Sequence, residues 1–441
     1  CNAQKNSSVV AEINPFNYTS SKKVIAENGA VVSAHPLASK VGVVILKMGG
    51  NAVDAAIATQ LALAVVYPVA GNIGGGGFLV GRLSNGELIS IDYREKAPGA
   101  ATRDMYIDET GKARTDLSQN GHLAGGVPGT VSGLFTSHQY AKLSFEKLIQ
   151  PAIDLAEKGF AITSGEARSF NSIQENLKKY NSVMPAFVKQ IAWKEGDTLI
   201  QTDLANTLKR IQKNGAAGFY EGETANLIVA EMKRGNGIIS LGDLKNYKAK
   251  PRTPQTFNYK GYKIVGMGMP SSGGLLMAQM MKMIEGRGID KMGFHSVQAV
   301  QLMTEVQRRA YADRAEYMGD ADHYNVPVEM LASDKYLKER MKSYKSDKAT
   351  PSTEIKPRID IDVESEETTH LSVIDKEGNA ISVTTTLNGG YGSKTVIGGA
   401  GFFLNNEMDD FSIKPGVPNM FGAVGGDANA IKPGKRMLSS M

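Results

Sequence analysis

The sequence predicts an α+β fold in which helices cover two β-sheets. Strand-like segments gather near the two ends of the chain, whereas residues 125–345 are mainly helical in pattern. Glycine is abundant, with 48 residues, which indicates many tight turns and close backbone contacts rather than a helical bundle. Strands and helices segregated in this way are typical of layered α+β proteins.

The first predicted elements are a buried helix and the strands that follow it. Residues 50–68, GNAVDAAIATQLALAVVYP, are rich in Ala and Leu, and Asn51 and Asp54 stand where a helix would begin. The uncharged stretch 55–81 is not expected to cross a membrane, because Pro68 and the glycines between 71 and 77 interrupt it. GNIGGGGFLVGRL (71–83) leads into a strand, and ELISIDYREKAP (87–98) continues the sheet by alternation.

The central helices carry their own end signals, and a different segment follows them. Residues 151–160 begin with Pro, residues 224–235 end on Gly, and residues 295–320 show a long amphipathic pattern. In residues 342–367 charged residues, Ser, Thr and Pro dominate, and the last eight residues hold five acids. This composition predicts a mobile arm. Strands are then expected at HLSVID, AISVTTTLN and GGAGFFLNN.

The composition excludes several classes of function. Hydrophobic residues make up 41% and charged residues 22%, which is ordinary for a globular protein. Lys and Arg number 50 against 45 Asp and Glu, and no basic block is interleaved with aromatic residues, so a nucleic-acid surface has little support. The six histidines form no HExxH motif or close pair and there is one cysteine, so no metal site is expected. No cofactor is expected either.

Cys1 is the single cysteine, and a polar Asn/Ser/Lys-rich lead follows it. One hypothesis is a bacterial lipoprotein, exported to the periplasm or cell surface and lipid-anchored through Cys1. The alternative is a fragment or trimmed chain that happens to begin at Cys. Residues 1–22 are expected to be a tail that precedes the folded part.

Thr368 and Thr369 stand between the acidic arm and an apolar strand. A threonine hydroxyl is a poor nucleophile unless a base removes its proton, and an α-amino group with a pKa of about 7.7–8.0 suits that task. Such an amine exists only at a chain start, so cleavage between Glu367 and Thr368 would create nucleophile and base together. The alternative is that TTH simply opens a strand, because Thr is a good strand residue.

Two features could hold a carboxylate. Arg94 in DYREKAP is expected at a strand end, where a guanidinium can bind a carboxylate by two parallel hydrogen bonds. Ser439 and Ser440 in PGKRMLSSM are adjacent hydroxyl donors. Each feature by itself is more often a surface or structural one.

A third feature could hold an ammonium group. Glu407, Asp409 and Asp410 fall within one turn of LNNEMDDFS, where clustered acids accept hydrogen bonds or bind a metal. With Asn388 and the carboxylate-binding residues they suit a free amino acid head group, which carries COO⁻ and NH₃⁺ on one carbon.

In this order the motifs resemble the gamma-glutamyltranspeptidases, or glutathione hydrolases. The resemblance runs from about Lys23 to the last residue. It rests on these stretches: GNAVDAAIA, GNIGGGGF, DYREKAP, VPG (127–129), PSSGG (270–274), AYADRAEYMGD, TTHLSVID, TTTLN, NNEMDDFS, PGVPNMFGAVGGDANA and KRMLSSM. That family belongs to the N-terminal nucleophile hydrolases, so the resemblance implies an αββα four-layer sandwich and a precursor that cleaves itself.

The resemblance also implies subunits and a reaction. A large subunit (23–367) and a small subunit (368–441) would form a heterodimer. Thr368 would attack the γ-glutamyl amide of glutathione or a related compound, release the amine product and hold a γ-glutamyl ester. Water, or an amino acid or peptide acceptor, would then take the group.

Site roles follow from the same resemblance. Thr386 would hydrogen-bond the Thr368 hydroxyl, and residues 415–435 would form a lid over the glutamyl pocket. The substrate α-carboxylate would be held by Arg94, Ser439 and Ser440, and its α-amino group by Asn388, Glu407 and Asp410.

The chain departs from the family pattern at several positions. Glu407 stands where close bacterial relatives often carry Gln, and Met269 and Met437 replace prolines. The family continues past the paired serines with a Gly-Gly pair whose N–H groups form the oxyanion hole, so the small subunit is expected to be truncated at Met441. Two alternatives stay open: a cephalosporin or glutaryl acylase on the same fold, and an uncut, amino-acid-binding surface protein.

Overall fold

The structure is a computed structural model, and it divides into two compact units. It describes residues 13–20, 22–355 and 368–441. The first unit comprises Cys1–Ala100, Asp116–Pro251 and Glu367–Glu407. The second comprises Ala101–Thr115, Arg252–Glu366 and Met408–Met441.

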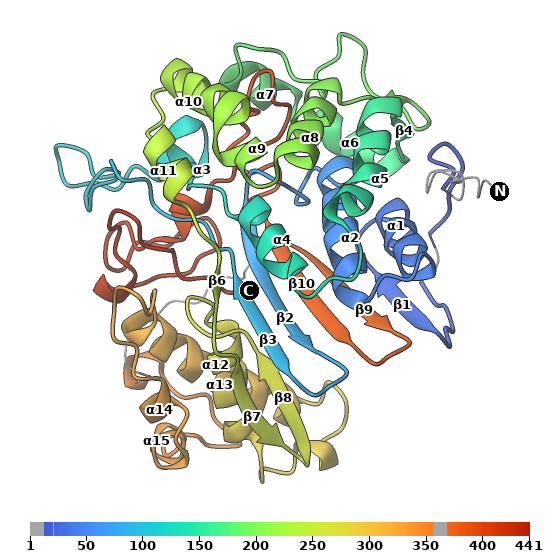
Figure 1. Ribbon diagram of the computed structural model, residues 1–441. Coiled ribbons are helices and arrows are strands. Elements are labelled where there is room, and N and C mark those ends of the chain that lie inside the picture. Colours follow the sequence, from blue (N-terminus) through green and yellow to red (C-terminus); the bar gives the residue numbers. More distant parts are fainter. Residues whose placement is uncertain (1–12, 21, 356–367) are drawn as a thin grey trace. The chain divides into compact units, whose positions relative to one another are not determined.

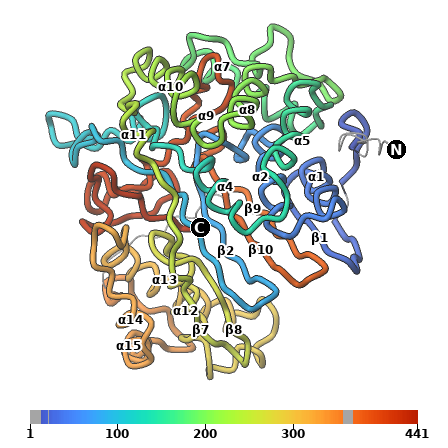
Figure 2. Tube along the Cα trace, viewed as in Figure 1, coloured from blue at the N-terminus to red at the C-terminus, as the bar shows by residue number. Residues whose placement is uncertain are grey.

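A six-stranded antiparallel sheet forms the centre of the first unit (Figure 1). The strand order is β1-β9-β10-β2-β3-β6. The bounds are β1 Gly29–Val32, β2 Gly76–Arg82, β3 Leu88–Asp92, β6 Lys250–Pro251, β9 Thr369–Asp375 and β10 Ala380–Thr386. Figure 2 shows β9 and β10, from late in the chain, lying beside strands from its beginning. The late hairpin is thus inserted between β1 and β2.

Helix α2 (Ala52–Val66) is the central helix of this unit and packs on β9 and β10. Every one of its residues is buried, which explains why the sequence is predominantly Ala, Leu and Val. Asn51 caps the helix by accepting hydrogen bonds from Val53 N and Asp54 N, and Asp54 Oδ2 in turn accepts a hydrogen bond from Asn51 N at 2.8 Å.

The other elements of the first unit surround this centre. Helix α1 packs on β1 and α2, α4 packs on β2 and β3, and α5 packs on α2. The bounds are α1 Pro36–Lys47, α3 Thr115–Gln119, η2 His122–Ala124, α4 Thr130–His138, α5 Phe145–Lys158, β4 Phe160–Ala161, α6 Ser164–Ser172, α7 Gln174–Tyr180, β5 Thr198–Leu199, α8 Thr202–Asn214, α9 Ala217–Tyr220, α10 Gly222–Gly235 and α11 Leu241–Asn246.

The second unit has its own hydrophobic core, built around the contact of α12 with α13. A two-stranded sheet, β7–β8, packs on α12. The bounds are β7 Gln255–Tyr259, β8 Tyr262–Gly266, α12 Gly273–Ile284, η3 Ile289–Lys291, α13 Val297–Tyr317, α14 Val328–Leu331, α15 Asp334–Arg340, η4 Ser352–Glu354 and η6 Asp427–Asn429. The short helix η5, Glu407–Asp410, begins at the last residue assigned to the first unit.

Most of the predicted elements are confirmed, but the expected strand at GGAGFFLNN is wrong. Only an isolated pairing of Val396 with Phe403 occurs there. Gly399 and Gly401 have φ of 75° and 79°, and the N–H groups of Ala400 and Gly401 both donate to Ile397 O. A tight turn therefore interrupts the apolar run, because these backbone angles leave the extended region.

Two further differences concern the sheets. The strand expected over 87–98 ends at Asp92, where the Asp92 carboxylate accepts a hydrogen bond from Arg94 N at 2.9 Å and turns the chain. In place of the two sheets expected, the described residues contain one six-stranded sheet and two sheets of two strands each.

The described part of the predicted mobile arm, residues 342–355, contacts α13 within the second unit. Thr350 N donates to Glu305 Oε1 at 3.0 Å, and Arg309 donates to Ser343 Oγ at 2.7 Å. The mobility of the arm stays a prediction, and Glu367 with residues 356–366 lies outside the described residues. Among the helices that the structure describes, none combines the length and apolarity that a membrane span requires.

Candidate active site

The two predicted catalytic threonines lie at the same end of the β9–β10 hairpin. The ladder pairs Thr369 with Thr385, so Thr368 and Thr386 follow as the next opposed positions. Their Oγ1 atoms are 3.4 Å apart, with Thr368 as the donor. Because side chains alternate along a strand, a slip of one residue would turn one hydroxyl to the other face. The register of the hairpin therefore brings the pair together.

Asp375 fixes that register at the opposite end of the hairpin. Its Oδ1 accepts hydrogen bonds from Glu377 N and Asn379 N, which close the turn. Its Oδ2 accepts from Ala52 N at 2.8 Å and from Asn379 Nδ2 at 2.7 Å. Burial would raise the pKa of Asp375, but these hydrogen bonds outweigh it and lower the pKa below its ordinary value. The turn is thus tied to the start of α2.

Asn388, two positions after Thr386, is hydrogen-bonded to it through its backbone. Thr386 is buried, and its Oγ1 accepts a hydrogen bond from Asn388 N at 2.8 Å. Asn388 has φ of 76°, a left-handed conformation that Asn tolerates better than most residues. Its side-chain Nδ2 donates to Asn406 O at 3.1 Å. The chain therefore bends sharply just after the β9–β10 hairpin.

The glycine run at the start of β2 packs against the end of β10. A Cβ on Gly75 would lie 2.1 Å from Thr386 O, and a Cβ on Gly77 would lie 2.2 Å from Thr384 O. Real Cβ atoms do not approach so closely, so glycine is required at both positions. The glycine run therefore packs in direct contact with the end of β10.

Asn72 is a residue of this site that the sequence reasoning missed. It is buried, and its Nδ2 donates to Thr386 O at 2.8 Å and to Thr385 Oγ1 at 3.1 Å. Its Oδ1 accepts from Gly75 N at 3.0 Å. Asn72 thus joins the glycine run to β10, and only its place before that run could have pointed to it.

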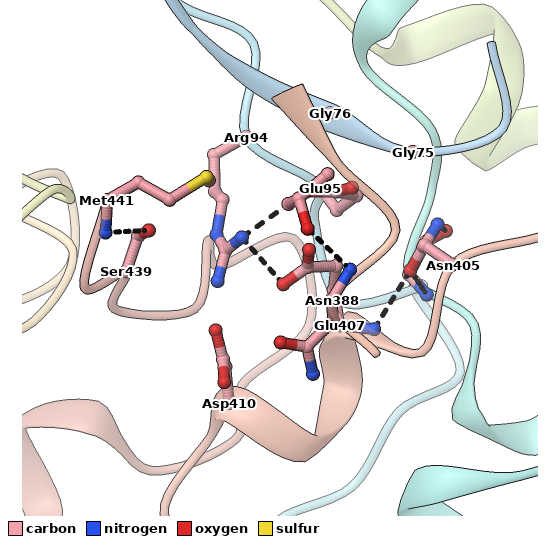
Figure 3. Close-up of polar contacts among 12 residues, drawn as sticks. Gly75, Gly76, Arg94, Glu95, Asn388, Asn405, Glu407, Asp410, Ser439 and Met441 are labelled. Carbon is pink, nitrogen blue, oxygen red and sulfur yellow. Dashed lines mark hydrogen bonds and ion pairs between the residues drawn. The ribbon is translucent and has the colours of Figure 1, made fainter. Parts of the chain in front are cut away.

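Arg94 and Glu407, both predicted to bind substrate, form a buried ion pair (Figure 3). Arg94 Nη1 lies 2.6 Å from Glu407 Oε2, and the two side chains are 1% and 0% exposed. Glu95, which the sequence reasoning also missed, is buried with its Oε2 3.8 Å from the same nitrogen. Tyr247 holds the backbone here by donating to Arg94 O at 2.7 Å. Such a pair is expensive to break, since either partner alone would be a buried charge.

Asn405 supports the backbone that carries Glu407, and it too was missed. Its Oδ1 accepts hydrogen bonds from Glu407 N at 3.1 Å and from Gly126 N at 2.8 Å. Its Nδ2 donates to Gly74 O and Gly126 O, each at 2.9 Å. Three segments that are distant in sequence meet at this one amide.

The remaining predicted residues, Asp410, Ser439 and Ser440, belong to the second unit and are described within it. Asp410 Oδ1 accepts a hydrogen bond from Asn419 Nδ2 at 3.0 Å. Ser439 is buried, and its Oγ accepts from Met441 N at 3.0 Å (Figure 3). Ser440 is exposed, and its Oγ accepts from the Arg314 guanidinium at 3.0 Å.

His370 is the histidine nearest in sequence to Thr368. Its ring nitrogens lie 2.8 Å from Thr384 Oγ1 and 3.1 Å from Ser372 Oγ, and partial burial lowers its pKa. These contacts give no support to His370 as the base for Thr368. The described residues also contain no group of three or more His, Cys, Asp or Glu side chains arranged to hold a metal ion.

A threonine at the head of a strand, inside an antiparallel sheet covered by helices, defines the class. The fold is the α+β fold of the N-terminal nucleophile hydrolases, which confirms the fold class predicted from the sequence.

The comparisons with known proteins identify the family. Residues 38–441 match the model of the gamma-glutamyltranspeptidase family. The chain is 46% identical over 428 residues to the glutathione hydrolase proenzyme of Escherichia coli (strain K12), covering 95% of this chain and 73% of that protein. The chain therefore belongs to the gamma-glutamyltranspeptidase family, and it is an enzyme that acts on γ-glutamyl groups.

Solved structures agree with this assignment. The gamma-glutamyltranspeptidase of Helicobacter pylori is 44% identical, with a TM-score of 0.74, over 76% of this chain and 97% of that chain. A cephalosporin acylase from Bacillus halodurans has a TM-score of 0.80 over 96% of this chain and 76% of that chain, but only 27% identity. The acylases share the fold, whereas the higher identity lies with the gamma-glutamyl enzymes.

Proposed function

We propose that Thr368, freed as an amino-terminal residue by cleavage after Glu367, is the nucleophile of this enzyme. It takes the γ-glutamyl group from glutathione and related γ-glutamyl compounds and passes it to water, or to an amino acid or peptide. The observation that carries the proposal is the 3.4 Å approach of Thr368 Oγ1 to Thr386 Oγ1 at the end of the hairpin. The name of the Escherichia coli relative, a glutathione hydrolase proenzyme, supports both the substrate and the cleavage.

Self-cleavage needs only groups of the chain and one water molecule. Thr368 Oγ1 attacks the carbonyl carbon of Glu367, and the acyl group moves from the Thr368 nitrogen to its oxygen. Water then hydrolyses the ester, which leaves a carboxylate on Glu367 and a free amine on Thr368. Thr386 Oγ1 has two lone pairs and accepts from both Asn388 N and Thr368 Oγ1, so it helps to orient the attacking hydroxyl.

The mature reaction repeats this chemistry on the substrate. The free α-amine of Thr368 removes the hydroxyl proton, and the oxygen attacks the γ-carbonyl carbon. The C–N bond breaks, the amine product leaves with the proton, and a γ-glutamyl ester stays on Thr368. Water or an acceptor amine then attacks the ester and restores the hydroxyl.

The substrate head group is proposed to bind through complementary charges. Arg94 would hold the α-carboxylate with Ser439 and Ser440, and Glu407 would hold the α-amino group with Asn388 and Asp410. The buried ion pair of Arg94 and Glu407 supports this part of the proposal. A zwitterion offers a carboxylate to the guanidinium and an ammonium to the carboxylate, so each buried charge keeps an opposite partner.

The proposed large subunit (23–367) and small subunit (368–441) form a heterodimer. The pairing of β9 with β1 and of β10 with β2 supports this, because each pair joins one proposed subunit to the other. We also propose that the enzyme is exported and lipid-anchored through Cys1. That proposal rests on the sequence alone, since Cys1 lies outside the described residues.

The test is the intact mass of purified protein under denaturing conditions, together with release of p-nitroaniline from γ-glutamyl-p-nitroanilide. The unchanged protein should give two pieces, one beginning at Thr368, and Thr368→Ala should give a single inactive chain. Thr369→Val is the matched control, because the Thr369 hydroxyl is buried and makes no hydrogen bond among the described residues. Cleavage of Thr368→Ala at the same bond, or loss of cleavage in Thr369→Val alone, would contradict the proposal.

A further inference from the structure

Two consecutive acids in the second unit are bound by two consecutive residues of the loop 415–425. Asn419 Nδ2 donates to Asp410 Oδ1 at 3.0 Å, and Met420 N donates to Asp409 Oδ2 at 2.8 Å. Asp409 is fully buried, whereas Asp410 is partly exposed. The loop is thus seated on this acidic pair, and the more exposed acid is the one bound by a side chain.

The orientation of the Asn419 amide is determined by its own turn. Its Oδ1 accepts hydrogen bonds from Phe421 N at 3.0 Å and from Ala423 N at 2.9 Å. Backbone N–H groups need an acceptor, so the amide oxygen must face them and the amide nitrogen must face Asp410. Two backbone bonds between Asn419 and residues 422–423 close the same turn.

The backbone beneath the Asp410 side chain is held independently of Asn419. Asn429 Nδ2 donates to Asp410 O at 2.7 Å, and Ser412 N, two residues further on, donates to Asn429 O at 3.0 Å. The bond from Asn419 therefore acts on the carboxylate itself, whose rotation it restricts.

We propose that Asn419 is a positioning residue for the substrate α-amino group. Its amide holds the Asp410 carboxylate in the orientation that accepts the ammonium. The rotational freedom of the carboxylate is therefore already restricted before the substrate binds, and binding does not have to restrict it. The inference rests on the proposed function, in which Asp410 contacts that ammonium. It extends the specificity for γ-glutamyl over glutaryl groups to a loop residue that does not itself touch the reacting atoms.

The test compares two donors that differ only in the α-amino group, γ-glutamyl-p-nitroanilide and glutaryl-p-nitroanilide. Asn419→Ala should raise KM for the γ-glutamyl donor about five- to tenfold, with kcat changed less than about twofold. The glutaryl donor should be unaffected. Asp410→Asn should remove the preference for the γ-glutamyl over the glutaryl donor. The double variant should have the same KM for the γ-glutamyl donor as Asp410→Asn alone, because both changes act on one interaction.

Lys414→Ala is the matched control for general loosening of the loop. Lys414 immediately precedes the loop, and its Nζ donates to Gly111 O at 2.8 Å rather than to Asp410. Equal loss with both donors, an equal effect of Lys414→Ala, or an undiminished effect of Asn419→Ala in the Asp410→Asn background would overturn the role of Asn419. If Asp410→Asn keeps the full preference, the proposed contact of Asp410 with the ammonium fails as well. Intact masses confirm in each variant that self-cleavage is unchanged.

Discussion

The end of the β9–β10 hairpin and the loop 415–425 position candidate site residues by different physical means. Thr368 and Thr386 are positioned by strand register, a buried amide and a glycine that leaves no free space. Asp410 is oriented by a turn closed by the side chain and backbone of Asn419. The first arrangement depends on contacts between distant segments, so it should fail as a whole. The second is local, so it should weaken by degrees.

The largest expected loss of stability comes from adding a side chain at Gly75, where the hairpin leaves no room for one. In Gly75→Ala the new Cβ would meet Thr386 O at 2.1 Å, whereas in Gly426→Ala the nearest atom, Ala315 O, is 3.4 Å away. We expect Gly75→Ala to lose about 3 kcal/mol or more of folding free energy and to remain uncut. Gly426→Ala should stay within about 0.5 kcal/mol of the unchanged protein. Urea unfolding and intact mass measure both; equal stability of the two variants would break the comparison.

A smaller effect is expected from removing the hydroxyl of Thr386 at constant shape. Thr386→Val leaves Asn388 N without its acceptor and Thr368 without its hydrogen-bond partner. We expect self-cleavage and kcat to fall about 10- to 100-fold, with a stability loss of about 1–3 kcal/mol from the unpaired N–H. Thr386→Ser keeps the hydroxyl and should retain most of both rates. Unchanged rates in Thr386→Val would show that the hydroxyl has no part in the chemistry.

The smallest expected effect on stability concerns residues 396–401, which lie between the hairpin and the loop 415–425 in the sequence. Glu231 holds it by accepting a hydrogen bond from Gly398 N at 3.0 Å, and His122 lies 2.8 Å from the same carboxylate. Burial would raise the pKa of Glu231, but hydrogen bonds with His122, Arg234 and Gly398 outweigh it and lower the pKa from 4.5 to about 2.

A pKa lower in the folded than in the unfolded state gives stability that is present above the unfolded value. That stability is lost as the pH falls through about 4.5 towards about 2. We therefore expect Glu231→Gln to be less stable than the unchanged protein near neutrality and to lose less stability on acidification. Urea midpoints at about pH 6 and about pH 3 measure this. A parallel loss in both proteins would show that Glu231 contributes nothing to the acid sensitivity.

The sequence predicted the elements and residues that periodicity and family motifs mark. The fully buried α2, the hairpin β9–β10 and the long α13 were all anticipated, as was the proximity of Thr368 to Thr386. The apolar run at 398–406 was wrongly predicted as a strand, because two glycines with positive φ outweigh its hydrophobic pattern.

The missed residues are short polar side chains with distant partners. Asn72 and Thr386 are 314 positions apart, and Asn405 and Gly74 are 331 apart. No local pattern records such a pairing. Glu95 was missed for a different reason, since a charged residue beside an arginine normally suggests a solvated surface rather than the buried position observed.

The insertion of β9 and β10 between β1 and β2 affects how the enzyme folds and how it is inactivated by unfolding. With the proposed cleavage, the sheet is assembled while the polypeptide is continuous, and the covalent link is removed only afterwards. An uncut precursor that unfolds can recover at a rate independent of its concentration. A cut enzyme that unfolds releases two polypeptides, whose recovery becomes a second-order encounter in competition with aggregation. After cleavage, unfolding is therefore no longer readily reversible. The lifetime of the active form is then set by its rate of unfolding.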